Sequence, residues 1–311
     1  MKDQSERFKS MPEKPLVTIT AICHNHAPYV IETLESIRNQ TYKNIELIII
    51  NNLKDNCRQI IEDWITTNGI KCRFIQNEQP LTISQNFNLA LSFTNGKYFQ
   101  TISCDDILMT SKIEKQVNFF EALDNNYAVV YGDELRINEY GDRIGEETLF
   151  QERLRKYNLA TLAKGNLISF FSEVAFLSAP SLLYKTEILR KMNGFDEDFF
   201  IEDWPLFLKL SKHGYYFDYI DEVVVKYRIL SSSLSHSRNW HYHLEHLRIY
   251  YKYKDVLIKN SRTSFKIRFY LIDVGRHSFK YFIQYYFRLF TLIPKDARSH
   301  LKYLNALFKL K

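Results

Sequence analysis

Four apolar, mostly β-branched runs alternate with amphipathic segments in the first third of the chain, and this alternation limits the fold more than any other feature. Each run has the length and composition of a buried strand. The runs are Leu16–Ile22, Ile45–Ile50, Cys72–Ile75 and Tyr98–Ile102. Strands that alternate with helices at this spacing predict an α/β fold, with a mainly parallel, Rossmann-like sheet covered by helices on both faces.

Two local patterns suggest where further elements begin and end. Ser111 and Glu114 have the spacing of a capping box, which would open a helix that runs to Leu123. Residues 138–142 read Asn-Glu-Tyr-Gly-Asp, a composition that favours a hairpin turn between two short strands.

The bulk composition narrows the class of protein. Of the 311 residues, 45% are apolar, enough for a sizeable core. The four cysteines form no CxxC pair, so we expect reduced thiols rather than disulfides or a zinc site. The first fifteen residues lack the apolar region of a secretory signal, and no uncharged apolar run reaches the roughly 18 residues of a spanning helix. We therefore expect a cytoplasmic protein.

The charge balance changes sharply near residue 238. Residues 238–311 contain 16 Lys/Arg and 4 Asp/Glu, whereas the preceding 237 residues contain 26 and 32. We therefore expect a polar segment over residues 1–14, a globular domain over residues 15–237, and a helical, basic and aromatic region over residues 238–311. A region of this kind favours contact with an anionic partner.

Polar side chains follow three of the predicted strands. In open parallel sheets, ligands bind beyond the carboxyl ends of the strands. The three polar groups are Cys23-His24-Asn25, Asn51-Asn52 and Asp105-Asp106. Adjacent carboxylates repel each other, and a hard divalent cation such as Mg²⁺ or Mn²⁺ would offset that repulsion and bridge them to a phosphate. The alternative is that one aspartate caps the next helix while the other is solvated.

A second acidic group lies far along the chain, where Glu202-Asp203 is flanked by Phe199-Phe200-Ile201 and Trp204. A carboxylate among large apolar groups can have a pKa tuned for general base catalysis. The alternative is structural, because Asp203 precedes Trp204-Pro205 and would serve equally as a helix N-cap.

These segments together resemble the family 2 glycosyltransferases of bacterial surface-polysaccharide synthesis. The resemblance covers about residues 15–235 and implies the GT-A fold and an inverting reaction. It is carried by Val17–Asn25, Glu35–Tyr42, Ile45–Asn52, Gly96–Asp106, Gly194–Glu197 and Glu202-Asp203.

The resemblance also implies a role for individual residues. Asp105 and Asp106 match the acids that hold a divalent metal, Mg²⁺ or Mn²⁺, and the ribose–diphosphate of a nucleotide sugar. Asp203 matches the base that deprotonates the acceptor hydroxyl. Four further residues would border the nucleotide base: Cys23, His24, Asn25 and Asn52.

The chain departs from the family pattern at three places. Asn51-Asn52 replaces two aspartates, of which the second commonly accepts a hydrogen bond from uracil, and Ser103 replaces the first acid of the DxDD form. Leu230 stands where a histidine often assists the metal diphosphate, and His236 is near enough in sequence to substitute.

The resemblance further implies the partners. We expect a nucleotide-sugar donor, UDP-linked first, and a glycan or lipid-linked acceptor for capsule or O-antigen at the inner face of the plasma membrane. The basic, aromatic region would then lie on the membrane; alternatively it packs on the globular domain or another subunit. Nucleic acid ranks last as a partner because no nucleic-acid module is present.

Two other functions stay open. A nucleotidyltransferase would share the acidic metal site, but it would normally have a loop rich in Gly, Arg or Lys after the first strand, where this chain has CHNHAPY. A catalytically inactive binding protein on a GT-A scaffold is the other alternative. A dinucleotide-dependent dehydrogenase is excluded, since no GxGxxG follows the first strand.

Overall fold

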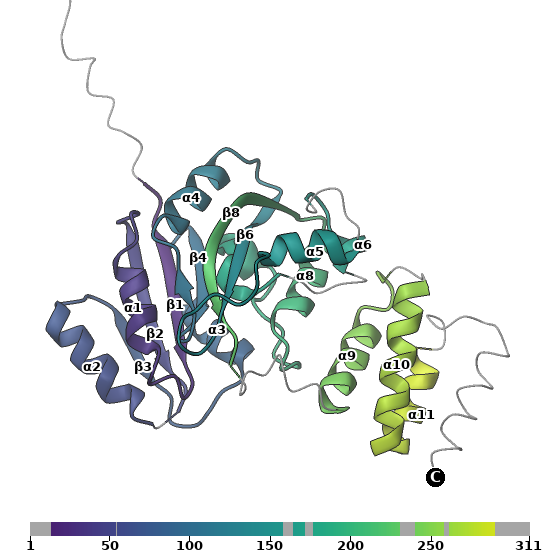
Figure 1. Cartoon of the computed structure of the whole chain (residues 1–311). Helices are drawn as coiled ribbons and strands as arrows, with labels where there is room; N and C mark the ends of the chain where they lie inside the picture. The colour runs from purple at the N-terminus through teal and green to yellow at the C-terminus, as the bar shows by residue number, and fades with distance from the viewer. Residues whose placement is uncertain are drawn as a thin grey trace, which may run out of the picture.

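The computed structural model of the chain describes residues 14–53, 55–157, 164–171, 177–230, 240–257 and 261–289. Over these residues the strands form one sheet in the order β3-β2-β1-β4-β7-β6-β8-β5, which Figure 1 shows with helices on both sides. The strands are β1 (Val17–Cys23), β2 (Ile45–Asn51), β3 (Arg73–Gln76), β4 (Tyr98–Ser103), β5 (Ile107–Leu108), β6 (Tyr127–Ile137), β7 (Leu183–Lys185) and β8 (Tyr216–Arg228).

The helices of the described residues fall into crossovers, edge helices and a C-terminal group. They are α1 (Val30–Arg38), α2 (Cys57–Asn68), α3 (Ile83–Phe93), α4 (Lys112–Glu121), α5 (Leu149–Tyr157), α6 (Ile168–Phe171), the 3-10 turn η2 (Ala179–Ser181), α7 (Thr186–Lys191), α8 (Asp203–Lys212), α9 (Trp240–Lys252), α10 (Ser261–His277) and α11 (Phe279–Arg288).

The first half of the sheet is parallel, as the alternation predicts. Strand β1 pairs in parallel with both β2 and β4, and β2 pairs in parallel with β3. Cys23 lies opposite Asn51, and Ile22 lies opposite Ser103. The carboxyl ends of β1, β2 and β4 therefore meet at one edge, which is where a parallel sheet gathers its functional loops.

The second half of the sheet is mixed. Strand β7 pairs antiparallel with β4 and β6, whereas β6 pairs in parallel with β8 through several register shifts. The predicted turn forms, since Gly141, at φ 89°, donates its N–H to the carbonyl of Asn138. The two short strands expected beside it do not form, because the turn follows the 11-residue β6 and is closed by a single antiparallel bridge between Ile137 and Arg143. The α/β prediction is therefore confirmed as a mixed sheet whose first half is parallel.

The predicted capping box is wrong. Ser111 precedes α4 but its side chain caps nothing, and the helix ends at Glu121 rather than Leu123. Reciprocal capping pairs form instead at α3, between Thr82 and Gln85, and at the start of α5, between Thr148 and Gln151. Thr82 has an extended backbone (ψ 164°), whereas Ser111 (ψ 7°) does not, and an N-cap needs the extended form.

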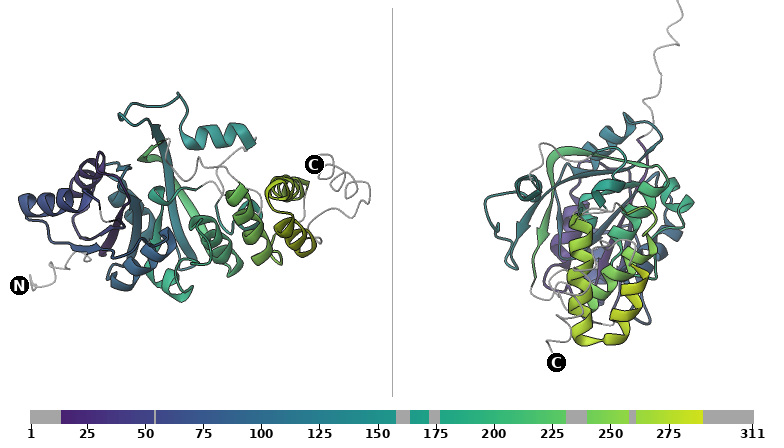
Figure 2. Two further views of the ribbon diagram at one scale, coloured as in Figure 1. Left: turned by 90° about the horizontal axis from the view of Figure 1, so that it is seen from below. Right: turned by 90° about the vertical axis from the view of Figure 1, so that its right-hand side faces the viewer.

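In the described parts of the basic, aromatic region, residues 240–257 and 261–289, the chain is mostly helical, as expected, and some of these residues belong to the main core. Leu247, Ile267 and Phe282 are fully buried in the same apolar cluster as Phe207 of α8. Figures 1 and 2 show α9 against the sheet domain and α10 and α11 beyond it. In the described part of the chain, none of the helices has the length and apolar character needed to span a bilayer.

Candidate functional site

Asp105 and Asp106 directly follow β4 at the edge where the parallel strands end. Asp106 is 2% exposed. Its Oδ1 accepts the N–H of Arg228 at 2.8 Å, and its carbonyl oxygen accepts the Thr33 hydroxyl at 2.7 Å. The backbone of the acid pair is therefore fixed from both sides, by β8 and by α1.

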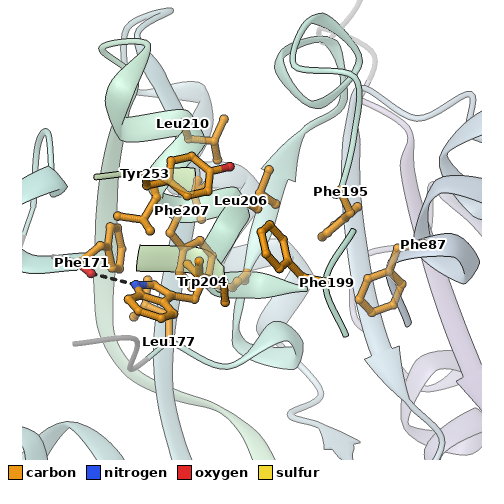
Figure 3. Close-up of a cluster of buried hydrophobic side chains, with 14 of the residues drawn as sticks. Phe87, Phe171, Leu177, Phe195, Phe199, Trp204, Leu206, Phe207, Leu210 and Tyr253 are labelled. Carbon is orange, nitrogen blue, oxygen red and sulfur yellow. Dashed lines mark hydrogen bonds between the residues drawn. The ribbon is translucent and has the colours of Figure 1, made fainter. Parts of the chain in front are cut away.

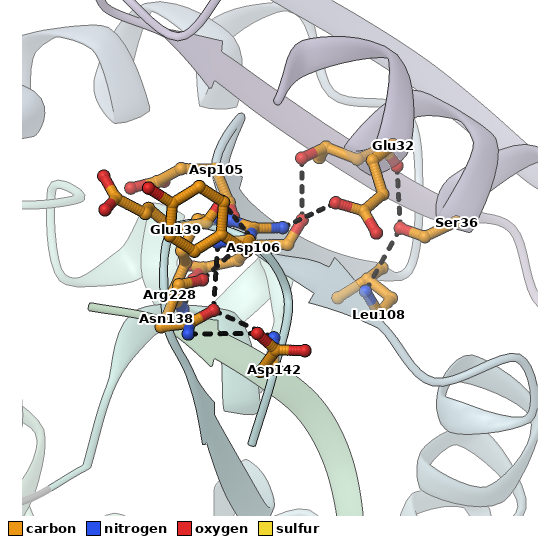
Figure 4. A network of polar contacts seen from close by, with 11 residues as sticks. Glu32, Ser36, Asp105, Asp106, Leu108, Asn138, Glu139, Asp142 and Arg228 are labelled. Carbon is orange, nitrogen blue, oxygen red and sulfur yellow. Dashed lines mark hydrogen bonds and ion pairs between the residues drawn. The ribbon is translucent and has the colours of Figure 1, made fainter. Parts of the chain in front are cut away.

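The side chain of Arg228 is the centre of this network, which Figure 4 shows. Its Nε donates to the Asp105 carbonyl oxygen at 2.8 Å, and its Nη2 donates to Glu32 Oε2 at 2.5 Å. Its Nη1 donates to the carbonyl oxygens of Asn138 and Glu139 at 3.0 and 3.1 Å. A guanidinium has five N–H donors in a fixed fork, and this one is satisfied while almost fully buried. The sequence prediction assigned Arg228 no role.

The electrostatics of the pair favour a bound cation. Burial, and then the charge of Asp105, raise the pKa of Asp106 well above its usual range. Glu134 of β6 adds a third negative charge near Asp106; burial raises the pKa of Glu134 to about 7. A divalent cation would take the place of the proton that such a group otherwise keeps.

Asp105 faces a histidine that the sequence prediction missed. His26 Nε2 lies 3.9 Å from Asp105 Oδ2, and the two side chains are 16% and 13% exposed. Asp105 Oδ1 and His26 Nδ1 are both buried without a hydrogen-bond partner. His26 stands one residue beyond the predicted Cys23-His24-Asn25 group, so only its position in the same loop could have identified it.

Asn52 is already engaged. Its Oδ1 accepts the Asn77 side-chain amide and the N–H of Leu81, each at 2.8 Å, and its Nδ2 donates to the Leu81 carbonyl oxygen at 2.9 Å. The same Nδ2 lies 3.1 Å from His24 Nδ1. Because both acceptor positions of Oδ1 are filled, Asn52 shapes the loop before α3 rather than offering a free acceptor.

The other loop residues divide between core and surface. Cys23 is fully buried, and its neighbour Cys104 and burial raise the pKa of its thiol, so its side chain lies in the core. Asn25 is exposed with φ 62°, and its N–H donates to Asp55 Oδ2 at 3.1 Å. Asp55 is therefore the carboxylate nearest this loop, one that the sequence prediction overlooked.

Asp203 is the first residue of α8. The N-cap position is held by Glu202 rather than by Asp203, and the Glu202 side chain makes no capping hydrogen bond. Asp203 Oδ1 accepts the N–H of the next residue, Trp204, at 2.5 Å. Burial raises the pKa of Asp203, and burial together with the charge of Asp203 raises that of Glu202. A carboxyl with a raised pKa suits proton abstraction near neutral pH.

Trp204 anchors the start of α8 in the core. Its indole Nε1 donates to the Phe171 carbonyl oxygen at 2.8 Å, as drawn in Figure 3. On α9, His246 and Tyr250 pack against the indole at ring-centroid distances of 5.2 and 5.1 Å. The carboxylate at Asp203 is thus attached to a rigid element.

Helix α9 also holds the segment before Asp203. Glu245, 1% exposed, accepts the N–H of Phe200 at 2.6 Å and Arg248 Nη1 at 2.7 Å. Arg248 Nη2 donates to the Asp198 carbonyl oxygen at 2.7 Å, and Lys252 forms ion pairs with Asp196 and Asp198. We name Glu245, Arg248 and Lys252 the α9 clamp.

The predicted His236 lies outside the described residues, and Leu230 is the last residue of the described range 177–230. Within the described ranges, no three His, Cys, Asp or Glu side chains are grouped to hold a metal on their own. The protein would thus contribute the two aspartates, and Mg²⁺ is commonly bound by one or two carboxylates with substrate phosphates. The unpartnered Asp105 Oδ1 fits this arrangement.

Comparison with known proteins identifies the family of this arrangement. Residues 18–192 match the family described as glycosyl transferase family 2. The O-antigen biosynthesis glycosyltransferase WbnJ of Escherichia coli is 27% identical, with 80% of this chain and 92% of that protein covered. The chain spans 92% of the length of WbnJ but only 21–30% of the length of glycosyltransferases from Rickettsia bellii, Rickettsia felis and Rickettsia conorii.

Solved structures show the same fold. S. aureus TarS 1-349 in complex with UDP-GlcNAc has a TM-score of 0.61 at 14% identity and covers 95% of this chain and 80% of its own. Mannosyltransferase PcManGT from Pyrobaculum calidifontis, in complex with GDP-Man and Mn²⁺, has a TM-score of 0.59 at 14% identity and covers 95% and 81%.

Proposed function

The chain belongs to glycosyl transferase family 2, and we propose that it is an inverting enzyme that moves a sugar from a nucleotide-sugar donor to a hydroxyl of a glycan acceptor. The observation that carries the proposal is the Asp105-Asp106 pair at the carboxyl end of β4, in which Asp106 is buried, Asp105 is 13% exposed and both are held by Arg228. That is where a parallel sheet binds nucleotides.

On the donor side, the acid pair would hold Mg²⁺ or Mn²⁺. When bound, the cation neutralises the charge that develops on the diphosphate leaving group. Arg228 fixes the two aspartates, so that they need not reorganise when the donor arrives. The Mn²⁺ in the PcManGT structure supports this part of the proposal.

On the acceptor side, Asp203 would accept the proton of the attacking hydroxyl. The oxygen would attack the anomeric carbon from the face opposite the diphosphate, so that one bond forms as the other breaks and the configuration inverts. Trp204 and the α9 clamp hold the Asp203 carboxylate in place. Roles for His24 and Asn25 beside the nucleotide base remain part of the proposal.

UDP is our first choice of donor nucleotide, and a lipid-linked glycan of capsule or O-antigen type our first choice of acceptor. The UDP-GlcNAc complex of TarS and the O-antigen role in the name of WbnJ support these choices. Because Asn52 offers no free acceptor for uracil N3–H, a GDP-linked donor is the second choice.

The test is a panel of UDP-, GDP-, dTDP- and CMP-sugars with Mn²⁺ or Mg²⁺, in which release of the nucleotide leaving group is measured. We expect one base class to be turned over, and only with a divalent cation present. Binding and turnover of none of them would favour an inactive protein on this fold. Release of pyrophosphate from a nucleoside triphosphate and a sugar phosphate would favour a nucleotidyltransferase.

The raised pKa of Asp203 predicts a pH dependence. The base acts when deprotonated, so kcat should be full above the raised pKa and fall about tenfold per pH unit below it. We expect this decline to begin well above pH 4, the ordinary range for aspartate. The measurement is kcat at saturating donor, with donor affinity determined in the same buffers. A kcat that stays level down to pH 4 would contradict the assignment.

The α9 clamp should matter for transfer and little for donor binding. Glu245→Ala leaves the Phe200 N–H and the Arg248 guanidinium without their acceptor. We expect a loss of about 2–4 kcal/mol in the free energy of unfolding and roughly a tenfold fall in kcat, with donor Kd unchanged. Glu245→Gln keeps an acceptor, so its stability and its kcat should lie between those of the wild type and those of Glu245→Ala. Lys280→Ala on α11 is the control and should leave stability and kcat unchanged. Equal effects of Glu245→Ala and Lys280→Ala would contradict the role of the α9 clamp.

The distal helices α10 and α11 would lie on an anionic membrane. Between residues 261 and 288 they carry six Lys/Arg and one acid. Four large aromatic side chains there are at least half exposed: Phe265, Phe269, Phe279 and Phe287. Exposed aromatics beside cations are the composition of interfacial helices.

Vesicle flotation tests this contact. We expect the protein to float with vesicles that contain phosphatidylglycerol and to stay behind with phosphatidylcholine alone, and Phe279→Ala/Phe287→Ala to weaken flotation several-fold. Flotation with neither vesicle would instead favour a face covered by protein, and equal flotation with both would contradict a role for the cations.

A further inference from the structure

His26 and Asp105 leave a gap that neither side chain fills. Nε2 and Oδ2 are 3.9 Å apart, beyond hydrogen-bonding distance. Each residue also has one buried polar atom without a partner, Nδ1 of His26 and Oδ1 of Asp105. Leaving such atoms unpaired costs free energy, and in native proteins a ligand or water usually satisfies them.

The chemistry of the two groups limits what can occupy the gap. A carboxylate only accepts hydrogen bonds, whereas a neutral imidazole donates from one nitrogen and accepts at the other. A phosphate oxygen can accept from the imidazole N–H but has no proton to donate to the carboxylate, whereas a hydroxyl can do both.

The distance suits a hydroxyl. An oxygen about 2.8 Å from each of two atoms that lie 3.9 Å apart subtends an angle of about 90°, which is open enough for a hydroxyl that donates to one and accepts from the other. Each carboxylate oxygen has two lone pairs, so Asp105 Oδ1 could accept a neighbouring hydroxyl of the same ring and still ligate the cation. The two oxygens of the Asp105 carboxylate and the N–H of the His26 imidazole together fit a vicinal diol.

We propose that His26 is a donor-binding residue, which donates from Nε2 to a hydroxyl of the donor's ribose while Asp105 accepts from the ribose diol. This inference rests on the proposed function and adds to it a residue that the family resemblance did not assign. Because Nε2 makes the contact, glutamine, whose side-chain amide can reach a similar point, should replace histidine better than alanine can.

The experiment is a cycle that combines protein variants with altered nucleotides. Calorimetry with Mn²⁺ would measure the Kd of UDP and GDP, and of their 2′-deoxy and 3′-deoxy forms, for the wild type, His26→Ala and His26→Gln. For the nucleotide that binds, we expect His26→Ala to raise Kd about tenfold, the worth of one hydrogen bond to a polar ligand. His26→Gln should restore most of the affinity.

The decisive result is that the effect of the His26→Ala substitution and the effect of removing the contacted hydroxyl should not add. Against the deoxy form that lacks the contacted hydroxyl, His26→Ala should change Kd by less than about twofold, an outcome that general loosening of the site would not produce. Equal tenfold losses with all forms, or no loss with any, would overturn this inference and leave the proposed function intact. A loss of affinity seen only with complete nucleotide sugars would indicate that the contacted diol belongs to the transferred sugar rather than to the ribose. Failure of the wild type to bind either nucleotide would remove both proposals.

Discussion

Asp203→Asn should abolish glycosyl transfer while leaving the donor bound. An amide of the same shape still accepts the Trp204 N–H through Oδ1, so the start of α8 should keep its structure. It cannot take up the proton of the acceptor hydroxyl, and loss of a general base typically costs about 10²–10⁴-fold in rate. We expect kcat to fall in that range and donor Kd to change by less than about twofold.

Initial-rate kinetics with calorimetry on the same protein would measure both quantities. Glu202→Gln is the matched control, since it removes the neighbouring acid of the same half-buried pair. If Glu202→Gln abolished transfer and Asp203→Asn did not, the base would be the other member of the pair. Full transfer by both variants would place the base elsewhere.

Asp106→Asn should have the opposite signature. The amide keeps an oxygen for the Arg228 N–H and removes one of two adjacent buried charges, so the folded protein should lose no stability. What is lost is a charged ligand for the cation. We expect the Kd of the donor in Mn²⁺ to rise about 100-fold, since polarising metal contacts contribute several kcal/mol.

Titration of the donor with and without Mn²⁺ would test this, with thermal unfolding as the check on stability. Asp63→Asn, an acid on the outer surface of α2, is the control and should behave as wild type. An Asp106→Asn protein that kept both its affinity and its response to Mn²⁺ would show that the pair is not the cation site.

The parallel half of the sheet and the position of the acid pair could be predicted because they depend on local patterns. Runs of apolar, β-branched residues can be recognised in the sequence as buried strands. Parallel pairing then brings the carboxyl ends of these strands together. The failed capping box at Ser111 marks the limit of local reasoning. The spacing of residue types was right, but the backbone there is not extended, and the sequence alone does not reveal that.

The partners of the site residues could not be predicted, because they are distant in sequence. Arg228 lies 122 residues from Asp106, and Glu245 lies 45 residues from Phe200. A buried arginine looks the same in sequence as a solvated one. Asn52 illustrates the converse: the family pattern predicted a contact to the nucleotide base, whereas its side chain is occupied by Asn77 and Leu81.

The described helices of the basic, aromatic region differ in a way that composition alone could not reveal. Helix α9 packs its apolar face into the main core and clamps the segment before Asp203, whereas α10 and α11 keep exposed aromatic side chains. Sequence analysis offered membrane contact or packing on the globular domain as alternatives. The structure shows packing for α9 and for the inner faces of α10 and α11, and membrane contact stays a proposal for the outer faces of α10 and α11.

The anomeric configuration of the product tests the central claim most directly. With the donor sugar identified by the panel and a synthetic acceptor, proton NMR of the transferred sugar reports whether the configuration at its anomeric carbon has changed. A single displacement with Asp203 as base requires inversion, so an α-linked donor should give only a β-linked product. A product that retained the donor's configuration would contradict the mechanism proposed for these two acidic sites.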